Sequence, residues 1–188
     1  APEDRVILPP NLKWWEAILP VLCDRKCRVM CVDSGNIDEA GLITPYIQGW
    51  KVLDLGFSEN MRQLLRILLR KGRRRTIIFQ MSTRESQVYF DELRTNHVEF
   101  DHRLFIPYEF GTCVHEDKDR QRRELRNYLA TLLKRAVADA RADSVIFNNA
   151  DIMRATLGLF QEWELRMPDD IAAVAVEDYP RINRMEDC

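Results

Sequence analysis

The stretch Arg141–Pro180 constrains the fold of this chain more than any other part of the sequence. It predicts a buried strand at Ser144–Asn148, a polar turn, an amphipathic helix at Ile152–Leu165 and a second buried strand at Ile171–Val176. Two short apolar strands joined by a helix form a βαβ unit, and such a unit implies a parallel sheet. The sequence therefore predicts an α/β fold built around this unit.

Polar residues follow both strands of the predicted unit. Asn148, Asn149 and Asp151 come at the end of the first strand, and Glu177 and Asp178 come at the end of the second. Ligands of open parallel sheets bind outside the carboxyl ends of the strands. These amide and carboxylate groups gather where a small polyhydroxylated ligand would need hydrogen-bonding partners.

The rest of the chain repeats this alternation of short apolar strands with helices. We expect further strands at 5–8, 28–32, 51–55, 76–80 and 103–107. Further helices are expected at 11–19, 59–71, 84–96 and 116–141. About seven strands alternating with about five helices indicate an α/β protein with parallel sheets.

Local signals predict where two of these helices begin or end. Ser58 is expected to cap the helix that follows it, and Gly72 is a natural C′ residue at its other end. Pro20 is expected to kink or interrupt the first helix, because it lacks a donor and clashes with the preceding turn. The basic run 70–75 is interpreted as the solvated end of a helix rather than as a phosphate or DNA site.

Composition and charge exclude several function classes. The net charge of −2 and the pI near 6.0 carry no nucleic-acid signature. No apolar run approaches the length of a membrane span, and the first residues show no secretory signal. The five cysteines are an odd count, which argues against a secreted disulfide framework. We therefore expect a cytoplasmic protein that does not act at a membrane.

The cysteines and histidines predict no metal site. Cys23, Cys27 and Cys31 are not at a common ligand spacing, and Cys31 lies in an apolar strand pattern where a thiol acts as a small hydrophobe. The three histidines have no second ligand at metal spacing. We also find no phosphate-binding loop, nucleophile elbow or other enzymatic motif. Neither catalytic residues nor a cofactor is therefore expected.

Three segments carry a family resemblance. The first matches an apolar strand that ends near Asn-Asp, at Phe147–Asp151. The second matches a Leu-x-x-Pro-x-Asp-Ile passage, at Leu165–Ile171, and the third matches an apolar strand that closes with Asp-Asp, at Val174–Pro180. In these segments the chain resembles the effector-binding domain of the lactose-repressor/galactose-repressor family of bacterial transcription regulators. It departs from the family pattern at Ala150, which replaces an Asn, and at Glu177, which replaces the first Asp.

The resemblance extends to the middle of the chain. Leu68–Thr76 matches the helix-to-strand passage of the family, with Arg73 in the place of a His. In the family an Arg three residues before a Gly-aromatic pair contacts the effector. Here Tyr89-Phe90 replaces the pair and Ser86 stands in the Arg position. Arg84, at the start of the predicted helix, is the candidate to replace this Arg.

The resemblance covers most of the chain, from Arg5 to about Pro180, and implies a two-lobed fold like that of periplasmic binding proteins. Residues 1–75 would form part of a first lobe, residues 76–180 a second lobe and residues 181–188 a tail. Family members have further segments on both sides of the matching region, so the resemblance implies truncation at both ends and an incomplete first lobe. Exposed edges of such a half-sheet would favour pairing with another copy, as a homodimer, or with a missing segment.

Six residues are the predicted ligand-binding set. Asp151, Glu177 and Asp178 would accept hydrogen bonds from sugar hydroxyls, and Asn149 would both donate and accept. Arg84 would clamp hydroxyls or a carboxylate bidentately, and Asp54 would contribute from the first lobe. Each acidic residue has a plainer interpretation as a helix cap or turn residue, which is strongest for Asp151. The plainer interpretation of Arg84 is a surface residue in the first turn of a helix.

The resemblance implies a ligand-sensing module of a bacterial transcription regulator. A carbohydrate or similar effector would close the lobes and alter the pose of a DNA-binding domain that is absent from this chain, so DNA would be contacted only through that domain. Such coupling requires different affinities for two states. A solute-binding protein of a sugar transport system is the alternative, and an enzyme is not expected.

Overall fold

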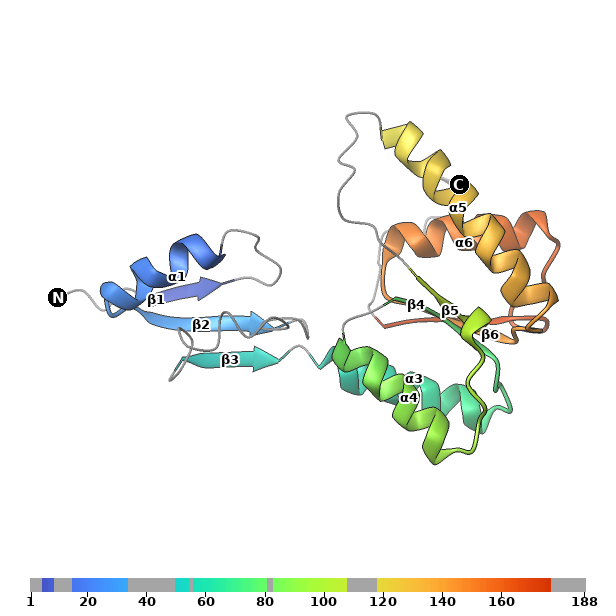
Figure 1. Cartoon of the computed structure of the whole chain (residues 1–188), viewed down its shortest axis with the longest axis horizontal. Helices are drawn as coiled ribbons and strands as arrows, with labels where there is room; N and C mark the ends of the chain where they lie inside the picture. Colours follow the sequence, from blue (N-terminus) through green and yellow to red (C-terminus); the bar gives the residue numbers. More distant parts are fainter. Residues whose placement is uncertain are drawn as a thin grey trace.

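The computed structural model describes residues 5–8, 15–33, 50–54, 56–80, 83–107 and 118–176. Their strands form two separate parallel sheets, one from the first part of the chain and one from the rest (Figure 1). The predicted α/β class with parallel sheets is therefore confirmed.

The first sheet has three strands in the order β1-β2-β3, with β1 at Arg5–Leu8, β2 at Arg28–Asp33 and β3 at Lys51–Asp54. Helix α1 (Trp15–Asp24) packs against it through Leu19 and Leu22. The helix continues through Pro20, so the predicted interruption is wrong, and the alternative of a kink stays a prediction. A proline removes one intrahelical hydrogen bond, and the apolar contacts of α1 with the sheet compensate for that loss.

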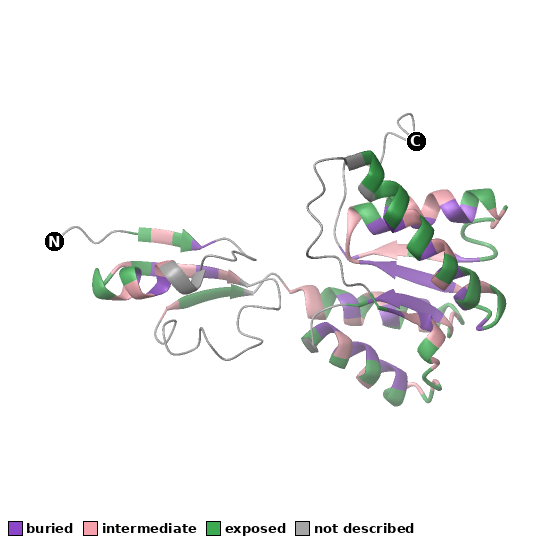
Figure 2. Cartoon of the chain, turned by 45° about the horizontal axis from the view of Figure 1, so that its top comes forward, coloured by how far each residue is buried: buried purple, intermediate pink, exposed green. Residues whose placement is uncertain are grey.

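The second sheet has four parallel strands in the order β5-β4-β6-β7. Strand β4 spans Thr76–Phe79, β5 Phe105–Ile106, β6 Ser144–Phe147 and β7 Ala172–Ala175. All residues of β4 and β6 are buried, as expected for the centre of a parallel sheet (Figure 2). The structure confirms the predicted βαβ unit, but β7 is a half-exposed edge strand rather than a buried one.

Two pairs of helices cover the two faces of this sheet (Figure 1). Helices α3 (Phe57–Arg70) and α4 (Thr83–Thr95) lie on one face, and α5 (Lys118–Ala138) and α6 (Ala150–Glu162) lie on the other. The first pair shares a core with the strand residues Ile78 and Ile146. The second pair packs on the alternate residues of the same strands: Ile77, Phe79, Val145 and Phe147. The alternation follows from the period of two in a strand.

The ends of α3 test two predictions. Gly56 occupies the N-cap with φ of 72°, so the expected cap at Ser58 is wrong. Ser58 lies inside the first turn, and its buried Oγ has no hydrogen-bond partner among the described residues. Gly72 ends the helix with φ of 79°, and Arg73 N donates to Leu68 O at 3.0 Å, as in a Schellman motif. The predicted role of Gly72 is confirmed.

A buried carboxylate joins α3 to α4. Glu92 is 4% exposed and accepts hydrogen bonds from Arg66 Nε at 3.1 Å and from Arg66 Nη2 at 2.8 Å. Arg62 Nε lies 3.5 Å from the same carboxylate. Together with the shared apolar core, these contacts assign α3 to the second sheet. A lobe boundary before Phe57 fits this packing better than the predicted division at residues 75 and 76.

Candidate ligand-binding site

The second sheet has a topological switch point between β4 and β6. From the end of β4 the chain passes through α4 to β5, and from the end of β6 it passes through α6 to β7. The two helices cover opposite faces of the sheet, and the two strands are direct neighbours. Adjacent parallel strands whose connections diverge in this way leave a crevice at their carboxyl ends, where ligands bind in open α/β sheets.

On the β6 side of the switch point, Asn149 caps α6. Its Oδ1 accepts hydrogen bonds from Asp151 N at 2.9 Å and from Ile152 N at 3.1 Å. The capping role considered for Asp151 therefore belongs to Asn149. Because Oδ1 is engaged in the cap, the Nδ2 group is the part of Asn149 that remains for a ligand.

Asp151 lies in the first turn of α6 with an exposed side chain. Its Oδ1 is 3.0 Å from Arg154 Nη1, and the two side chains are 60% and 43% exposed. An exposed pair one turn apart contributes little to stability. The carboxylate is therefore open to exchange this partner for a ligand hydroxyl at small cost.

On the β4 side, Arg84 lies in the first turn of α4 with an exposed side chain. The parallel pairing of β4 with β6 brings the starts of α4 and α6 to the same edge of the sheet, on opposite faces. Arg84 on one side and Asn149 and Asp151 on the other therefore flank the switch point.

Asn148, at the end of β6, is one of the strand-end polar residues noted in the sequence, but it is not in the predicted ligand-binding set. Its Oδ1 is buried, with no hydrogen-bond partner among the described parts of the chain. A buried polar atom without a partner costs about 1–3 kcal/mol. The polar strand end was visible in the sequence, but its missing partner depends on packing and was not.

The other three predicted residues are not joined to this edge by the described structure. The backbone of Asp54 ends β3 in the first sheet, opposite Asp33, and its side chain lies outside the described part of the chain. Glu177 and Asp178 directly follow Val176, the last described residue, and lie outside it too. Within the described ranges, no three His, Cys, Asp or Glu side chains converge as metal ligands.

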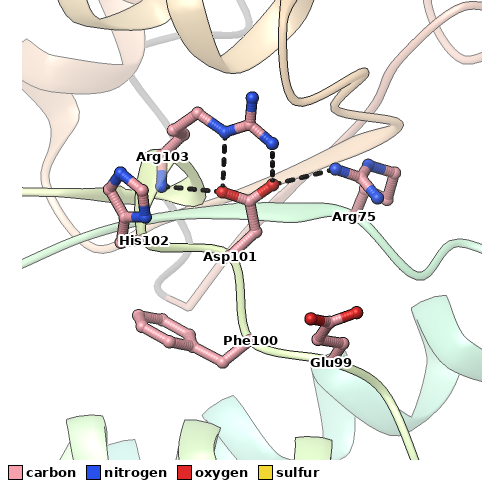
Figure 3. A pocket seen from close by; sticks show the side chains of 6 residues that line it. All are labelled: Arg75, Glu99, Phe100, Asp101, His102 and Arg103. Atoms are coloured by element: carbon pink, nitrogen blue, oxygen red, sulfur yellow. Dashed lines mark hydrogen bonds and ion pairs between the residues drawn. The ribbon is translucent and has the colours of Figure 1, made fainter.

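A polar pocket that the sequence does not predict lies at the opposite, amino edge of the second sheet (Figure 3). Arg75 directly precedes β4, and Arg103 lies in the short 3-10 helix His102–Leu104 that leads into β5. Both arginines bind the carboxylate of Asp101. Hydrogen bonds from the Arg103 side chain hold the pKa of Asp101 far below its ordinary value. The local signal was Asp101 followed two residues later by Arg103, a pattern of a capped turn.

The chain is similar to known proteins in structure but not detectably in sequence. No protein-family model and no curated protein sequence matches the chain. A regulatory protein of the LacI family from Chloroflexus aggregans superposes with a TM-score of 0.71 at 15% identity, over 98% of this chain and 60% of that one. A LacI-family sugar-binding transcriptional regulator from Escherichia coli, solved with phosphate, gives 0.64 at 10%, over 94% and 58%.

A LacI-family transcriptional regulator from Lactobacillus casei, solved with bound glucose, gives a TM-score of 0.60 at 16% identity, over 87% of this chain and 64% of that one. The present chain thus spans less than two thirds of the length of each of these structures. At these identities the likeness is one of fold. The chain therefore has the periplasmic-binding-protein-like fold of LacI-family regulators, as its resemblance to the lactose-repressor family predicts. In the described part of the chain, no helix is both long and apolar enough to cross a membrane.

Proposed function

We propose that this chain is the ligand-sensing module of a transcription regulator, and that its effector is a carbohydrate or a similar polyhydroxylated molecule. The observation that carries the proposal is the switch point between β4 and β6, flanked by Arg84, Asn149 and Asp151 from two helix starts. The likeness of the whole fold to LacI-family regulators supports the same class. All of these neighbours are regulators, which favours this function over solute transport and over catalysis.

The proposed site uses the hydrogen-bonding capacity of each side chain. The carboxylate of Asp151 accepts from a sugar hydroxyl, Asn149 Nδ2 donates, and the guanidinium of Arg84 clamps two oxygens bidentately. Asn148 Oδ1 gains a donor that it lacks in the described structure. Glu177 and Asp178 add acceptors after the end of β7, and Asp54 adds one from the first lobe. A neighbour solved with bound glucose supports this class of ligand.

The regulatory part of the proposal follows from the two-lobed fold. An effector that contacts both lobes stabilises their closed arrangement, and this shifts the pose of an attached DNA-binding domain if the two arrangements differ in effector affinity. The protein would act in the cytoplasm as a homodimer. The exposed apolar residues Ile7, Val52 and Leu53 of the first sheet support association with a partner surface.

Thermal unfolding of the chain against a panel of neutral sugars and sugar phosphates tests the proposal. A sugar at about 100 times its dissociation constant stabilises the fold by about 2.7 kcal/mol, and the shift in Tm should saturate. Asp151→Asn and Arg84→Gln should each reduce the shift. Glu124→Gln, a surface substitution in an ion pair with Arg120 on α5, is the matched control and should keep it. A panel without any saturable shift would contradict the carbohydrate class, and a shift that survives both substitutions would contradict the site.

A further inference from the structure

The pocket at the amino edge of the second sheet is a candidate for a second binding site. Its main hollow has a volume of about 410 Å³, within the usual range for small-ligand sites. It is lined by Arg75, Glu99, Phe100, Asp101, His102 and Arg103. An adjoining hollow of about 200 Å³ shares three of these residues and adds Arg74, His97, Val98 and Leu104. The strand β4 separates this edge from the proposed effector site.

Asp101 holds the two guanidinium groups of the pocket in fixed positions. Its Oδ1 accepts from Arg103 N at 3.0 Å and from Arg103 Nε at 2.9 Å, and its Oδ2 accepts from Arg103 Nη2 at 2.7 Å and from Arg75 Nη2 at 2.9 Å. Each arginine is also anchored to the segment after α5: Arg75 Nε donates to Ala140 O, and Arg103 Nη1 donates to Asp139 O at 3.3 Å. Figure 3 shows the two guanidinium groups flanking the carboxylate. The arginines are thus ordered before any ligand arrives.

The fixed guanidinium groups retain unused donors. Of its five N–H groups, Arg75 uses two in these contacts and Arg103 uses three. Three N–H groups of Arg75 and two of Arg103 therefore remain without an acceptor in the described structure. Guanidinium N–H groups match the oxygens of carboxylates and phosphates in a fork geometry. The wall of the pocket is therefore prepared for an oxyanion.

The charge and the apolar surface of the pocket narrow the class of ligand further. Arg74, Arg75 and Arg103 carry three positive charges, and Glu99 and Asp101 carry two negative ones, which leaves an excess of one positive charge. Phe100 is 45% exposed and lines the pocket, with its aromatic ring on the other side of Asp101 from the two guanidinium groups (Figure 3). The excess charge suits a single anionic group, and the ring suits an apolar part attached to it.

We propose that this pocket binds a small anionic ligand that presents a carboxylate or phosphate group to Arg75 and Arg103 and an apolar ring to Phe100. The site lies at the opposite edge of the sheet from the proposed effector site and does not depend on it. Glu99 limits the site to one anionic group, because a second anionic group on the ligand would face its carboxylate.

Titration of the whole chain with simple probes at constant ionic strength tests the proposal. The probes are benzoate, phenyl phosphate, acetate and inorganic phosphate, and the readout is the shift of the backbone amide resonances of residues 99–103. Benzoate and phenyl phosphate should give saturable shifts, with a dissociation constant several-fold below that of acetate or inorganic phosphate, respectively. The comparison of benzoate with phenyl phosphate identifies the preferred anionic group.

Two substitutions change the charge of the pocket in opposite directions without removing any contact of Asp101. Glu99→Gln should strengthen binding and Arg74→Gln should weaken it, each by about fivefold for a charge some 4 Å from the ligand in water. Both side chains are exposed, so the fold should be retained. Phe100→Ala should remove the advantage of the probes with a ring. Glu124→Gln on α5 is the control for a change of net charge elsewhere and should alter nothing.

The proposal is overturned if none of the four probes gives a saturable shift at the pocket. It is also overturned if the shifts occur but are the same in the wild-type chain, Glu99→Gln and Arg74→Gln, because binding elsewhere would then explain them. Arg84→Gln and Asp151→Asn should leave this binding intact, which separates the outcome from that of the effector site.

Discussion

The two sheets of this protein bury their apolar residues to very different extents. In the second sheet, four helices cover both faces and all residues of the central strands β4 and β6 are buried. In the first sheet, one described helix packs on the strands, and Ile7, Val52 and Leu53 are 65%, 48% and 48% exposed. Parallel strands are stable when both faces are covered. The second sheet is therefore the stable unit of the described structure, and the first sheet leaves apolar side chains exposed.

Substitution of a central core residue should show the difference in stability between the two sheets most clearly. Phe147 is fully buried and stacks on Phe79 with ring centroids 5.8 Å apart. Phe147→Ala should lower the free energy of unfolding by about 3–5 kcal/mol, because it removes a large buried ring and leaves a cavity. Leu53→Ala in the first sheet should cost far less. Urea denaturation followed by circular dichroism measures both, and equal losses would contradict the comparison.

The buried carboxylate between α3 and α4 gives a smaller effect that also tests where α3 belongs. Glu92→Gln should lower the free energy of unfolding by about 1.5–3 kcal/mol, the usual contribution of hydrogen bonds to a charged group. The matched exposed substitution Glu124→Gln should cost little. If α3 belongs to the second sheet, the loss should appear in the same unfolding transition that Phe147→Ala shifts. A loss confined to a separate, earlier transition would instead assign α3 to the first lobe.

Removal of the side-chain cap of α6 should lower the stability by a smaller amount, and this effect can be measured separately from ligand binding. Asn149→Ala removes the acceptor of two backbone N–H groups and should destabilise the second lobe by about 1 kcal/mol. Asn149→Ser keeps a capping oxygen but lacks an amide donor, so it should preserve the Tm and still weaken sugar binding. Thermal unfolding with and without sugar measures both effects. Unchanged sugar binding in Asn149→Ser would show that Nδ2 does not contact the effector.

Acid should weaken the second sheet through two carboxylates. Hydrogen bonds from Arg166 lower the pKa of Asp170 from 3.8 to about 2, and those from Arg103 lower the pKa of Asp101 further. A carboxylate whose pKa is lower in the folded state stabilises the fold above its unfolded pKa, and this contribution is lost as pH falls through the folded pKa. The free energy of unfolding should therefore be level near neutral pH and decline below about pH 4. Asp101→Asn should flatten that decline, and an unchanged slope would contradict the role of the ion cluster.

Most elements of the second sheet could be predicted because they carry a complete local signal. The strand expected at 103–107 is the exception, since a 3-10 helix at His102–Leu104 leaves only two residues for β5. Strand β6 is a run of apolar residues bounded by polar ones, and Gly72 marks the end of α3 in the sequence itself. The start of α3 was misplaced because Ser58 and Gly56 are both good caps and only tertiary contacts choose between them. The apolar residues of α3 recur at helical spacing, but this spacing alone cannot tell which sheet they pack against.

The amino-edge pocket could not be predicted for a different reason. Arg75 and Asp101 are 26 residues apart in sequence, and the segment after α5 that anchors Arg75 is 65 residues away. No local pattern links them: Arg75 meets Asp101 because β4 pairs with β5, and it meets the segment after α5 because β4 pairs with β6. At the carboxyl edge the topology follows a general rule, so Arg84, Asn149 and Asp151 could be placed near strand ends from the sequence, and their convergence on one ligand stays a prediction.

The shortness of β4 sets the distance between the two edges of the second sheet. This strand has four residues, or about 13 Å of length at 3.3 Å per residue. Arg75 directly precedes it, and the chain that follows it leads into α4 and Arg84. Because β4 is buried on both faces and paired on both sides, close packing holds it along its length. The two edges of the sheet, and with them the two proposed sites, are therefore separated by about the length of this one strand.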